Sequence, residues 1–190
     1  NTAEAGQMSP RNLLVTTITD ELRLATNFRG KVIGLAIKDR SAILPAGHSA
    51  KAAYWYDHDT GKWITSTYYQ DELPGWVKDF NNQKLADKYY ALDWNTVYPL
   101  DSYTQSAPPA RAFPHNLKQY AGKNYQVISA TPYGNSFTIE MAKAAIAGEQ
   151  LGADSITDML TVSLSSPDYI GHAYGPNSVE EEDCFLRLDK

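Results

Sequence analysis

Two continuous apolar runs limit the folds that are open to this chain. KVIGLAIK at residues 31–38 and DMLTVSLSS at residues 158–166 lack the strict alternation of polar and apolar residues that a strand with one wet face shows. Runs of this kind are typical of strands that are covered on both faces, as in parallel sheets. The sequence therefore predicts two buried strands of a parallel sheet.

Three helical segments accompany these strands. Ser9 can cap a helix over residues 9–26, and residues 135–152 repeat apolar side chains at helical spacing. Ser178 and Glu181 have the spacing of a capping box at the start of a third helix, which we expect to continue to the end of the chain. Helix, strand, excursion, helix, strand, loop and helix in this order predict an α/β fold with a mainly parallel sheet, layered between helices.

A long excursion separates the two predicted strands. Aromatic and β-branched runs on both sides of the turn sequence DHDTG predict a β-hairpin over residues 52–69. Residues 93–135 are rich in proline and have few periodic runs, which is typical of loops. We therefore expect residues 50–135 to form a loop-rich, hairpin-containing excursion that could act as a cap.

Composition argues against two classes of partner. The net charge is −5 and no long basic run is present, so we expect no nucleic-acid partner. No apolar stretch approaches the roughly 18 residues that a membrane-spanning helix needs, so we expect no membrane partner. Cys184 is the only cysteine, so no disulfide can form within the chain. Nothing in the sequence predicts an oligomeric state.

A carboxylate and an imidazole follow the second apolar run. In the stretch PDYIGHAYGP, Asp168 and His172 are four positions apart, and both residue types are common zinc ligands. Ligands of open parallel sheets bind outside the carboxyl ends of the strands, where we expect this stretch to form a loop. Two ligands are too few to define a metal site, so an ordinary polar loop is the alternative.

Two cations follow the first apolar run. Lys38 and Arg40 lie on either side of Asp39, and on an extended backbone residues two apart point the same way. Two fixed cations on one face could hold a phosphoryl group and offset negative charge in a transition state. A solvated basic pair that Asp39 neutralises is the alternative.

The remaining polar candidates have structural explanations. We interpret His48 and His115 as structural residues, the DHD sequence at residues 57–59 as part of a hairpin turn, and Cys184 as a buried, inert thiol. The aromatic residues between positions 54 and 69 are interpreted as packing. The sequence contains no P-loop, no nucleophile elbow and no pair of Cys-x-x-Cys motifs.

Several stretches resemble one known family. SPRNLLVTTITDEL, KVIGLAIKDRSAILPAGHSAKAAYWYD, TPYGNSFTIEMAKAAI and SSPDYIGHAYGPNSVEEEDCFLRLDK resemble bacterial phosphate-irrepressible alkaline phosphatases. These are monoesterases of the alkaline phosphatase superfamily, related to the nucleotide pyrophosphatase/phosphodiesterases. The most specific parts of the resemblance are the Lys-x-Arg after the first strand and the Asp-x-x-x-His-x-x-Gly-Pro after the second.

The resemblance implies a function and assigns roles. It implies hydrolysis of small-molecule phosphate monoesters at two zinc ions, through a phosphothreonine intermediate, in an enzyme exported to the periplasm. Asp168 and His172 match two ligands of one zinc ion, and Lys38 and Arg40 match cations that contact the phosphoryl group. The family's nucleophilic threonine and its other zinc ligands have no counterpart here. The resemblance therefore implies that residues 1–190 form an internal segment of the catalytic domain of a longer enzyme, with residues 50–135 as its cap-like insertion, and we expect this segment to be inactive by itself.

Two other functions stay open. The parent protein could be a phosphodiesterase or nucleotide pyrophosphatase of the same superfamily, or a non-catalytic binding domain that keeps the fold. The pair formed by Lys38 and Arg40 favours the monoesterase, because a dianionic terminal phosphoryl group gains most from two additional cations.

Overall fold

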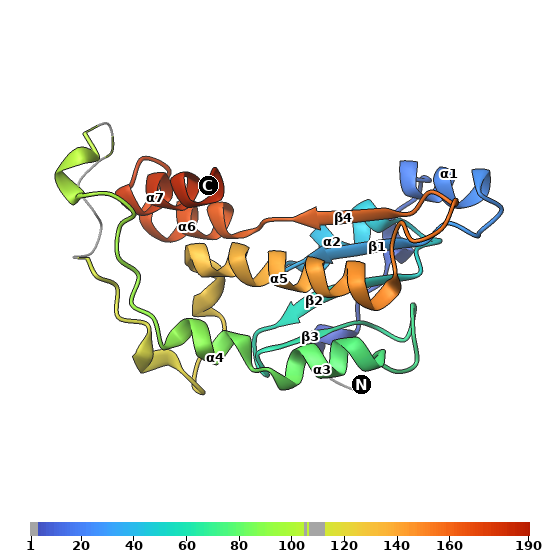
Figure 1. Ribbon diagram of the computed structural model, residues 1–190, viewed down its shortest axis with the longest axis horizontal. Helices are drawn as coiled ribbons and strands as arrows, with labels where there is room; N and C mark the ends of the chain where they lie inside the picture. Colours follow the sequence, from blue (N-terminus) through green and yellow to red (C-terminus); the bar gives the residue numbers. More distant parts are fainter. Residues whose placement is uncertain (1–3, 105, 107–112) are drawn as a thin grey trace. The chain divides into compact units, whose positions relative to one another are not determined.

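The computed structural model describes residues 4–104, 106 and 113–190 (Figure 1). The chain divides into two compact units, which are described separately below. The first unit contains the residues through Asp57, Lys62–Gln83 and Thr138–Ser163, and the second contains His58–Gly61, Lys84–Phe137 and Leu164–Lys190. Helices and a mixed sheet are both present, so the predicted α/β class is confirmed.

A mainly parallel sheet lies in the first unit. Its strand order is β3-β2-β1-β4. Strand β1 (Val32–Ala36) pairs in parallel with β2 (Ala52–Asp57) and with β4 (Met159–Ser163). Strand β3 (Lys62–Ile64) pairs antiparallel with β2. The sheet agrees with the parallel arrangement that the sequence predicts.

Burial differs between the two strands predicted from apolar runs. All five residues of β1 are buried, as the continuous run predicts. Strand β4 is only half-buried, so the prediction of complete burial is wrong there. The physical reason is position, because β4 lies at the edge of the four-stranded sheet, whereas β1 has neighbours on both sides.

The predicted hairpin is present and belongs to the central sheet. Asp57 of β2 pairs with Lys62 of β3 around the turn His58–Gly61. Gly61 has a φ of 69°, the left-handed region that favours glycine. The interpretation of residues 50–135 as a cap-like insertion stays a prediction.

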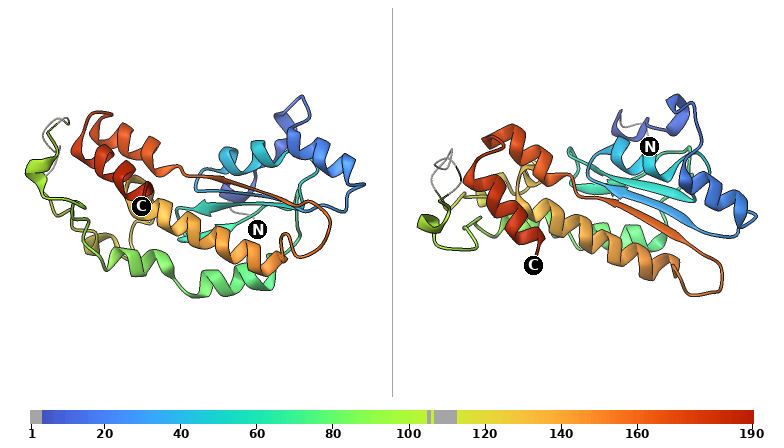
Figure 2. Two further views of the ribbon diagram at one scale, coloured as in Figure 1. Left: turned by 45° about the horizontal axis from the view of Figure 1, so that its top comes forward. Right: turned by 90° about the horizontal axis from the view of Figure 1, so that it is seen from above.

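Helices cover both faces of this sheet. Helix α2 (Asp39–Ala46) lies on one face, and the part of α5 (Pro132–Glu149) from Thr138 onward lies on the other, together with α3 (Gly75–Asn82) (Figures 1 and 2). The first unit is therefore built in three layers, as predicted.

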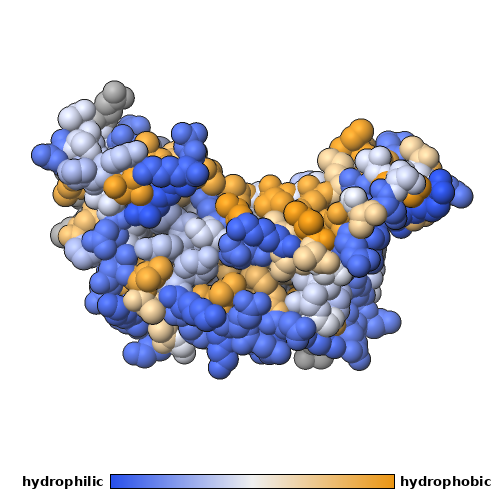
Figure 3. Space-filling model, in the orientation of Figure 1, coloured by the Kyte–Doolittle hydropathy of each residue, from blue (hydrophilic) through white to orange (hydrophobic). Residues whose placement is uncertain are grey.

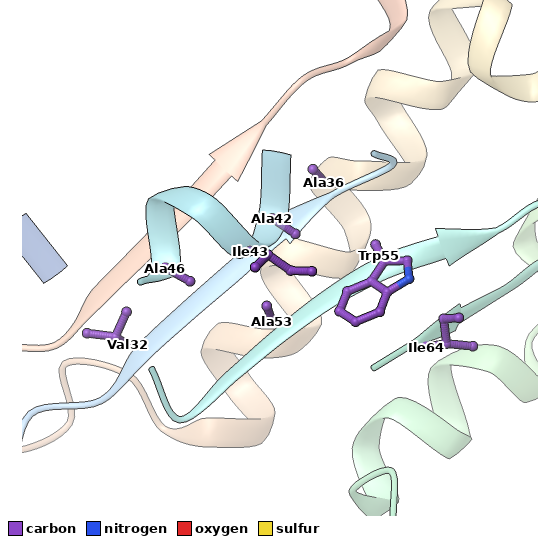
Figure 4. Close-up of a cluster of buried hydrophobic side chains, with 8 residues drawn as sticks. All are labelled: Val32, Ala36, Ala42, Ile43, Ala46, Ala53, Trp55 and Ile64. Carbon is purple, nitrogen blue, oxygen red and sulfur yellow. The ribbon is translucent and has the colours of Figure 1, made fainter. Parts of the chain in front are cut away.

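The core of the first unit lies between α2 and the sheet (Figure 4). It is a cluster of eight buried side chains: Val32, Ala36, Ala42, Ile43, Ala46, Ala53, Trp55 and Ile64. Gly34 of β1 allows α2 to approach closely, because a Cβ atom there would lie 2.1 Å from the carbonyl oxygen of Ala42. Small residues on both elements thus fix the position of α2 at the end of β1.

The first predicted helix begins later than the sequence indicates. Ser9 caps only the 3-10 helix η2 (Pro10–Asn12), and α1 spans Ile18–Ala25. Thr17 and Asp20 form the capping box that begins α1. Leu14, which the sequence predicts within this helix, precedes α1 and is 92% exposed. Figure 3 shows apolar surface over the α1 region.

The second unit is mostly helices joined by loops. It contains α4 (Leu85–Tyr90), the 3-10 helices η3 (Leu100–Ser102), η4 (Lys118–Tyr120) and η5 (Val127–Ala130), and the helices α6 (Ser166–Tyr174) and α7 (Val179–Leu188). Between α4 and α5 the described residues form only short 3-10 helices, loops and one isolated bridge, from Trp94 to His115. The loop-rich character predicted for this region is confirmed. None of the helices in the described residues is both long and apolar enough to cross a bilayer.

Candidate functional site

The stretch that carries Asp168 and His172 is a helix. The sequence predicts a loop here, and that prediction is wrong, because α6 begins at Ser166 and runs to Tyr174. Pro167 lies in the first turn, where its missing N–H costs no hydrogen bond, and Gly175 ends the helix with a φ of 102°. Pro167 and Gly175 are therefore compatible with the two ends of a short helix.

Asp168 and His172 lie on one face of α6. Helical neighbours four positions apart face each other, and Nε2 of His172 is 3.6 Å from Oδ1 of Asp168. Both side chains are accessible, with exposed fractions of 53% for Asp168 and 82% for His172. Zinc binds oxygen and nitrogen at about 2 Å, so these two atoms are close enough to share one ion.

The fit to a metal is partial. Carboxylate and imidazole are suitable zinc donors, and nothing in their local geometry opposes a shared ion. Within residues 4–104, 106 and 113–190, no group of three or more His, Cys, Asp or Glu side chains could hold a metal ion. These two residues can therefore supply part of a zinc site, and a complete site needs further ligands.

Glu181 is a residue that sequence reasoning did not assign to this site. Its backbone N–H donates to Oγ of Ser178, as the capping spacing predicts, but the backbone N–H of Ser178 donates to the carbonyl of Gly175. The carboxylate instead lies beside α6, where a Cβ on Gly171 would be 3.8 Å from it. Burial and the nearby charge of Asp168 raise the pKa of Glu181 to about 7.

Lys38 and Arg40 follow β1 directly, but not on an extended backbone. Lys38 is the N-cap residue of α2, and Arg40 lies in the first turn of that helix. The argument that both side chains point the same way along a strand is therefore wrong. Lys38 is half-buried and Arg40 is exposed. The start of a helix carries partial positive charge, so both cations lie where an anion is also favoured by the backbone.

The two pairs belong to different units. Lys38 and Arg40 are part of the first unit, and Asp168 and His172 are part of the second. Each pair follows a strand of the parallel sheet in sequence, which is the position where ligands of such sheets bind. That the four side chains form one site stays a prediction.

The other polar candidate residues have structural positions in the fold. His115 is buried, and its Nε2 lies 3.4 Å from Oε1 of the buried Glu180. Cys184 is 1% exposed, and burial, with the nearby charges of Glu181 and Asp183, raises its pKa to about 12, so the prediction of a buried thiol is confirmed. The DHD sequence lies at the hairpin, as predicted, with Asp57 ending β2.

The aromatic residues of the hairpin are core. Tyr54, Trp55, Tyr56 and Trp63 are all buried, and the rings of Tyr56 and Trp63 lie 6.2 Å apart. This confirms that these side chains pack the fold. Tyr68, at the end of the same stretch, is 47% exposed.

Comparisons with known proteins agree on one family. A family model described as type I phosphodiesterase / nucleotide pyrophosphatase matches residues 16–190. Alkaline phosphatase PhoV of Synechococcus elongatus is 57% identical to this chain over 202 residues. A protein of Myroides odoratus named calcium-transporting ATPase is 53% identical over 202 residues, and alkaline phosphatase PafA of Elizabethkingia meningoseptica is 51% identical over 199 residues.

The likeness extends to three dimensions. The crystal structure of wild-type alkaline phosphatase PafA matches 97% of this chain with a TM-score of 0.91 at 50% identity. The chain spans little more than a third of these relatives. The match to PhoV includes 100% of this chain and 37% of PhoV. For the Myroides odoratus protein these shares are 98% and 37%, and for PafA they are 97% and 36%. The chain covers 38% of the PafA chain in the crystal structure.

Proposed function

The chain belongs to the type I phosphodiesterase / nucleotide pyrophosphatase family, and we propose that it is a segment of a zinc-dependent phosphatase that hydrolyses phosphate monoesters. The observation that carries the proposal is the pair formed by Asp168 and His172, whose donor atoms lie 3.6 Å apart on an exposed helix face. The names of two similar proteins, both alkaline phosphatases, support the reaction class.

Asp168 and His172 hold zinc in this proposal. Zinc bound there supplies a Lewis acid that stabilises charge on oxygen during phosphoryl transfer. Burial, and to a smaller extent the charge of Asp168, raise the pKa of Glu181, so a cation bound by Asp168 would also offset the repulsion between these two carboxylates. A second zinc ion and the remaining ligands belong to other parts of the parent protein.

Lys38 and Arg40 bind the phosphoryl group. A monoester ends in a dianionic group, and charge on its equatorial oxygens is best stabilised by cations that are already in position. The start of α2 holds both residues, since Lys38 is the N-cap and Arg40 follows in the first turn. The nucleophile is a threonine outside this chain, which forms a phosphothreonine that water then hydrolyses. The chain alone is then inactive, because it lacks the nucleophile.

A phosphodiesterase or nucleotide pyrophosphatase is the second candidate. The description of the matching family favours it. The two functions differ in the charge that Lys38 and Arg40 meet, since a diester carries one negative charge where a monoester carries two. The parent acts in the periplasm in this proposal, in keeping with the bacterial source of the similar phosphatases.

The test compares a monoester with a diester. We expect the parent protein to hydrolyse 4-nitrophenyl phosphate faster than its methyl diester. Lys38→Ala and Arg40→Ala should each lower kcat/KM for the monoester by about 10²–10³-fold, with a smaller loss for the diester. The exposed residues Lys78 and Arg29 supply matched controls, and Lys78→Ala and Arg29→Ala should have no effect.

Two outcomes contradict the proposal. Preference for the diester in the unmodified parent would establish the second candidate. Turnover by the isolated 190-residue chain with added zinc, at the rate of the parent, would show that the nucleophile lies within this chain.

A further inference from the structure

Two overlapping cavities adjoin α6 in the second unit. One has a volume of about 360 Å³ and the other of about 480 Å³. They share four lining residues, Asn124, Val127, Ala130 and Ala173. The cavities therefore form one continuous depression between η5 and α6, which we call the α6 groove.

The groove begins at the proposed zinc ligand. His172 and Tyr169 line the smaller cavity, and Tyr174 and His115 line the larger one. The imidazole of His172 thus lies at one end of a depression that continues along the helix. A phosphoryl group bound beside His172 would therefore lie next to this groove, within the second unit.

The chemistry of the groove is uncharged. None of the described residues that line either cavity is Lys, Arg, Asp or Glu. Hydrogen-bonding capacity comes from the side-chain amides of Asn116, Gln119, Asn124 and Gln126, and ring surface from tyrosines such as Tyr120. Away from the end at His172, a second anionic group would lose its hydration without gaining a cation from the lining residues, which is costly.

The size of the groove suits a small organic group. Each cavity falls within the range of about 300–1,000 Å³ that is typical of small-molecule sites. Amides can donate to and accept from hydroxyl or heterocyclic groups, and aromatic and aliphatic walls can cover a ring. The occupant that fits is an uncharged, ring-bearing alcohol with several polar groups.

We propose that the α6 groove binds the organic part of the substrate, a sugar- or nucleoside-like alcohol that leaves when its phosphate is removed. This inference rests on the proposed phosphatase function, because it takes the phosphoryl group to lie at His172. The groove then selects esters of uncharged ring alcohols over substrates such as pyrophosphate, whose second group is anionic.

A substitution that fills the groove tests the proposal through the kinetics of ester hydrolysis. Ala130 lines both cavities, so Ala130→Phe should block the groove without changing Asp168 or His172. In the parent protein we expect kcat/KM for glucose 6-phosphate or adenosine 5′-monophosphate to fall by about tenfold or more, with that for methyl phosphate nearly unchanged. Comparing the two ring substrates shows whether sugar or nucleoside is preferred. The control is Ala121→Phe, at an exposed position that lines neither cavity.

A binding measurement keeps the test independent of catalysis. We expect glucose or adenosine, titrated without phosphate into the 190-residue chain, to shift the NMR signals of the Asn124 and Gln126 side-chain amides. Gln126→Ala, at an exposed position, removes one amide without filling the groove and should weaken this binding.

The possible results separate the two proposals. Equal losses on methyl phosphate and on the ring substrates, or NMR shifts confined to residues outside the groove, would overturn the inference. A parent protein that is inactive on every phosphate ester would contradict the proposed function, and the titration would then decide about the groove by itself.

Discussion

The indole Nε1 of Trp94 donates a 2.7 Å hydrogen bond to Oδ2 of Asp183, a residue 89 positions later in the chain. The same buried carboxylate accepts from the backbone N–H of Val97, the hydroxyl of Tyr103 and Nε of Arg187. Asp183 therefore connects the loops of the second unit to α7, the helix that also carries Glu181.

Replacing Asp183 should destabilise the second unit strongly. Asp183→Ala leaves the buried donors of Trp94 and Tyr103 without an acceptor, and Arg187 without its charge partner. We expect the free energy of unfolding to fall by about 3–5 kcal/mol, as for a buried ion pair broken on one side. Urea unfolding followed by tryptophan fluorescence measures this. As a control, Asp189→Ala, at the exposed C-cap of the same helix, should change the free energy of unfolding by less than about 0.5 kcal/mol.

Acid should weaken the first unit through Asp20. Burial alone would raise the pKa of this carboxyl, but hydrogen bonds from the N–H and hydroxyl of Ser49 and the N–H of Thr17 outweigh it and lower the pKa to about 2. A pKa lowered on folding adds stability that is complete above the unfolded value near 3.8 and is lost as the pH falls toward 2. The contribution is roughly 2 kcal/mol.

Asp20→Asn should remove this pH dependence. We expect the variant to be less stable than the unmodified chain at pH 7 and nearly equal to it at pH 2. Unfolding curves at a series of pH values measure the difference. Glu21→Gln changes a neighbouring exposed charge and should keep the slope between pH 4 and pH 2. A slope that Asp20→Asn leaves unchanged would contradict the assignment.

Gly47 should not tolerate a side chain. It ends α2 with φ 78° and ψ −166°, and a Cβ atom there would lie 2.4 Å from Oγ1 of Thr17 and 2.5 Å from Oδ2 of Asp20. Gly47→Ala should cost about 1–3 kcal/mol in backbone strain, with a further loss from the displaced capping box. Thermal unfolding measures the cost. Gly75→Ala is the control, because a Cβ at Gly75 meets nothing within 4 Å.

His172→Ala should weaken zinc binding by the chain. Two ligands hold the ion weakly, and removal of one should lower affinity at least about tenfold. Isothermal titration calorimetry with zinc at neutral pH measures the affinity. The control is His48→Ala, which also removes one histidine but should leave the zinc affinity unchanged. Equal affinities for zinc in His172→Ala and the unmodified chain would exclude α6 as the binding element.

Local signals in the sequence predicted much of the fold. The continuous apolar run of β1 is a property of consecutive residues, and so are the hairpin around DHDTG and the Ser178 cap of α7. Each depends on contacts within a few positions, so a short window of sequence contains enough information. The residue types of Asp168 and His172 identified both as candidate ligands, but the sequence did not predict the helix that places them on one face.

What the sequence determined by itself was the set of strands, the helices α5 and α7, and the identity of the two candidate pairs of residues. The tertiary structure decided how those pairs are presented. Lys38 and Arg40 lie at the start of α2, a helix that Gly34 allows to approach β1 closely, and α7 brings Glu181 beside Asp168. It also decided that β4 is an edge strand, and that η5 and α6 enclose a groove at His172. These features depend on contacts between residues far apart in the chain, which the local hydrophobic pattern does not encode.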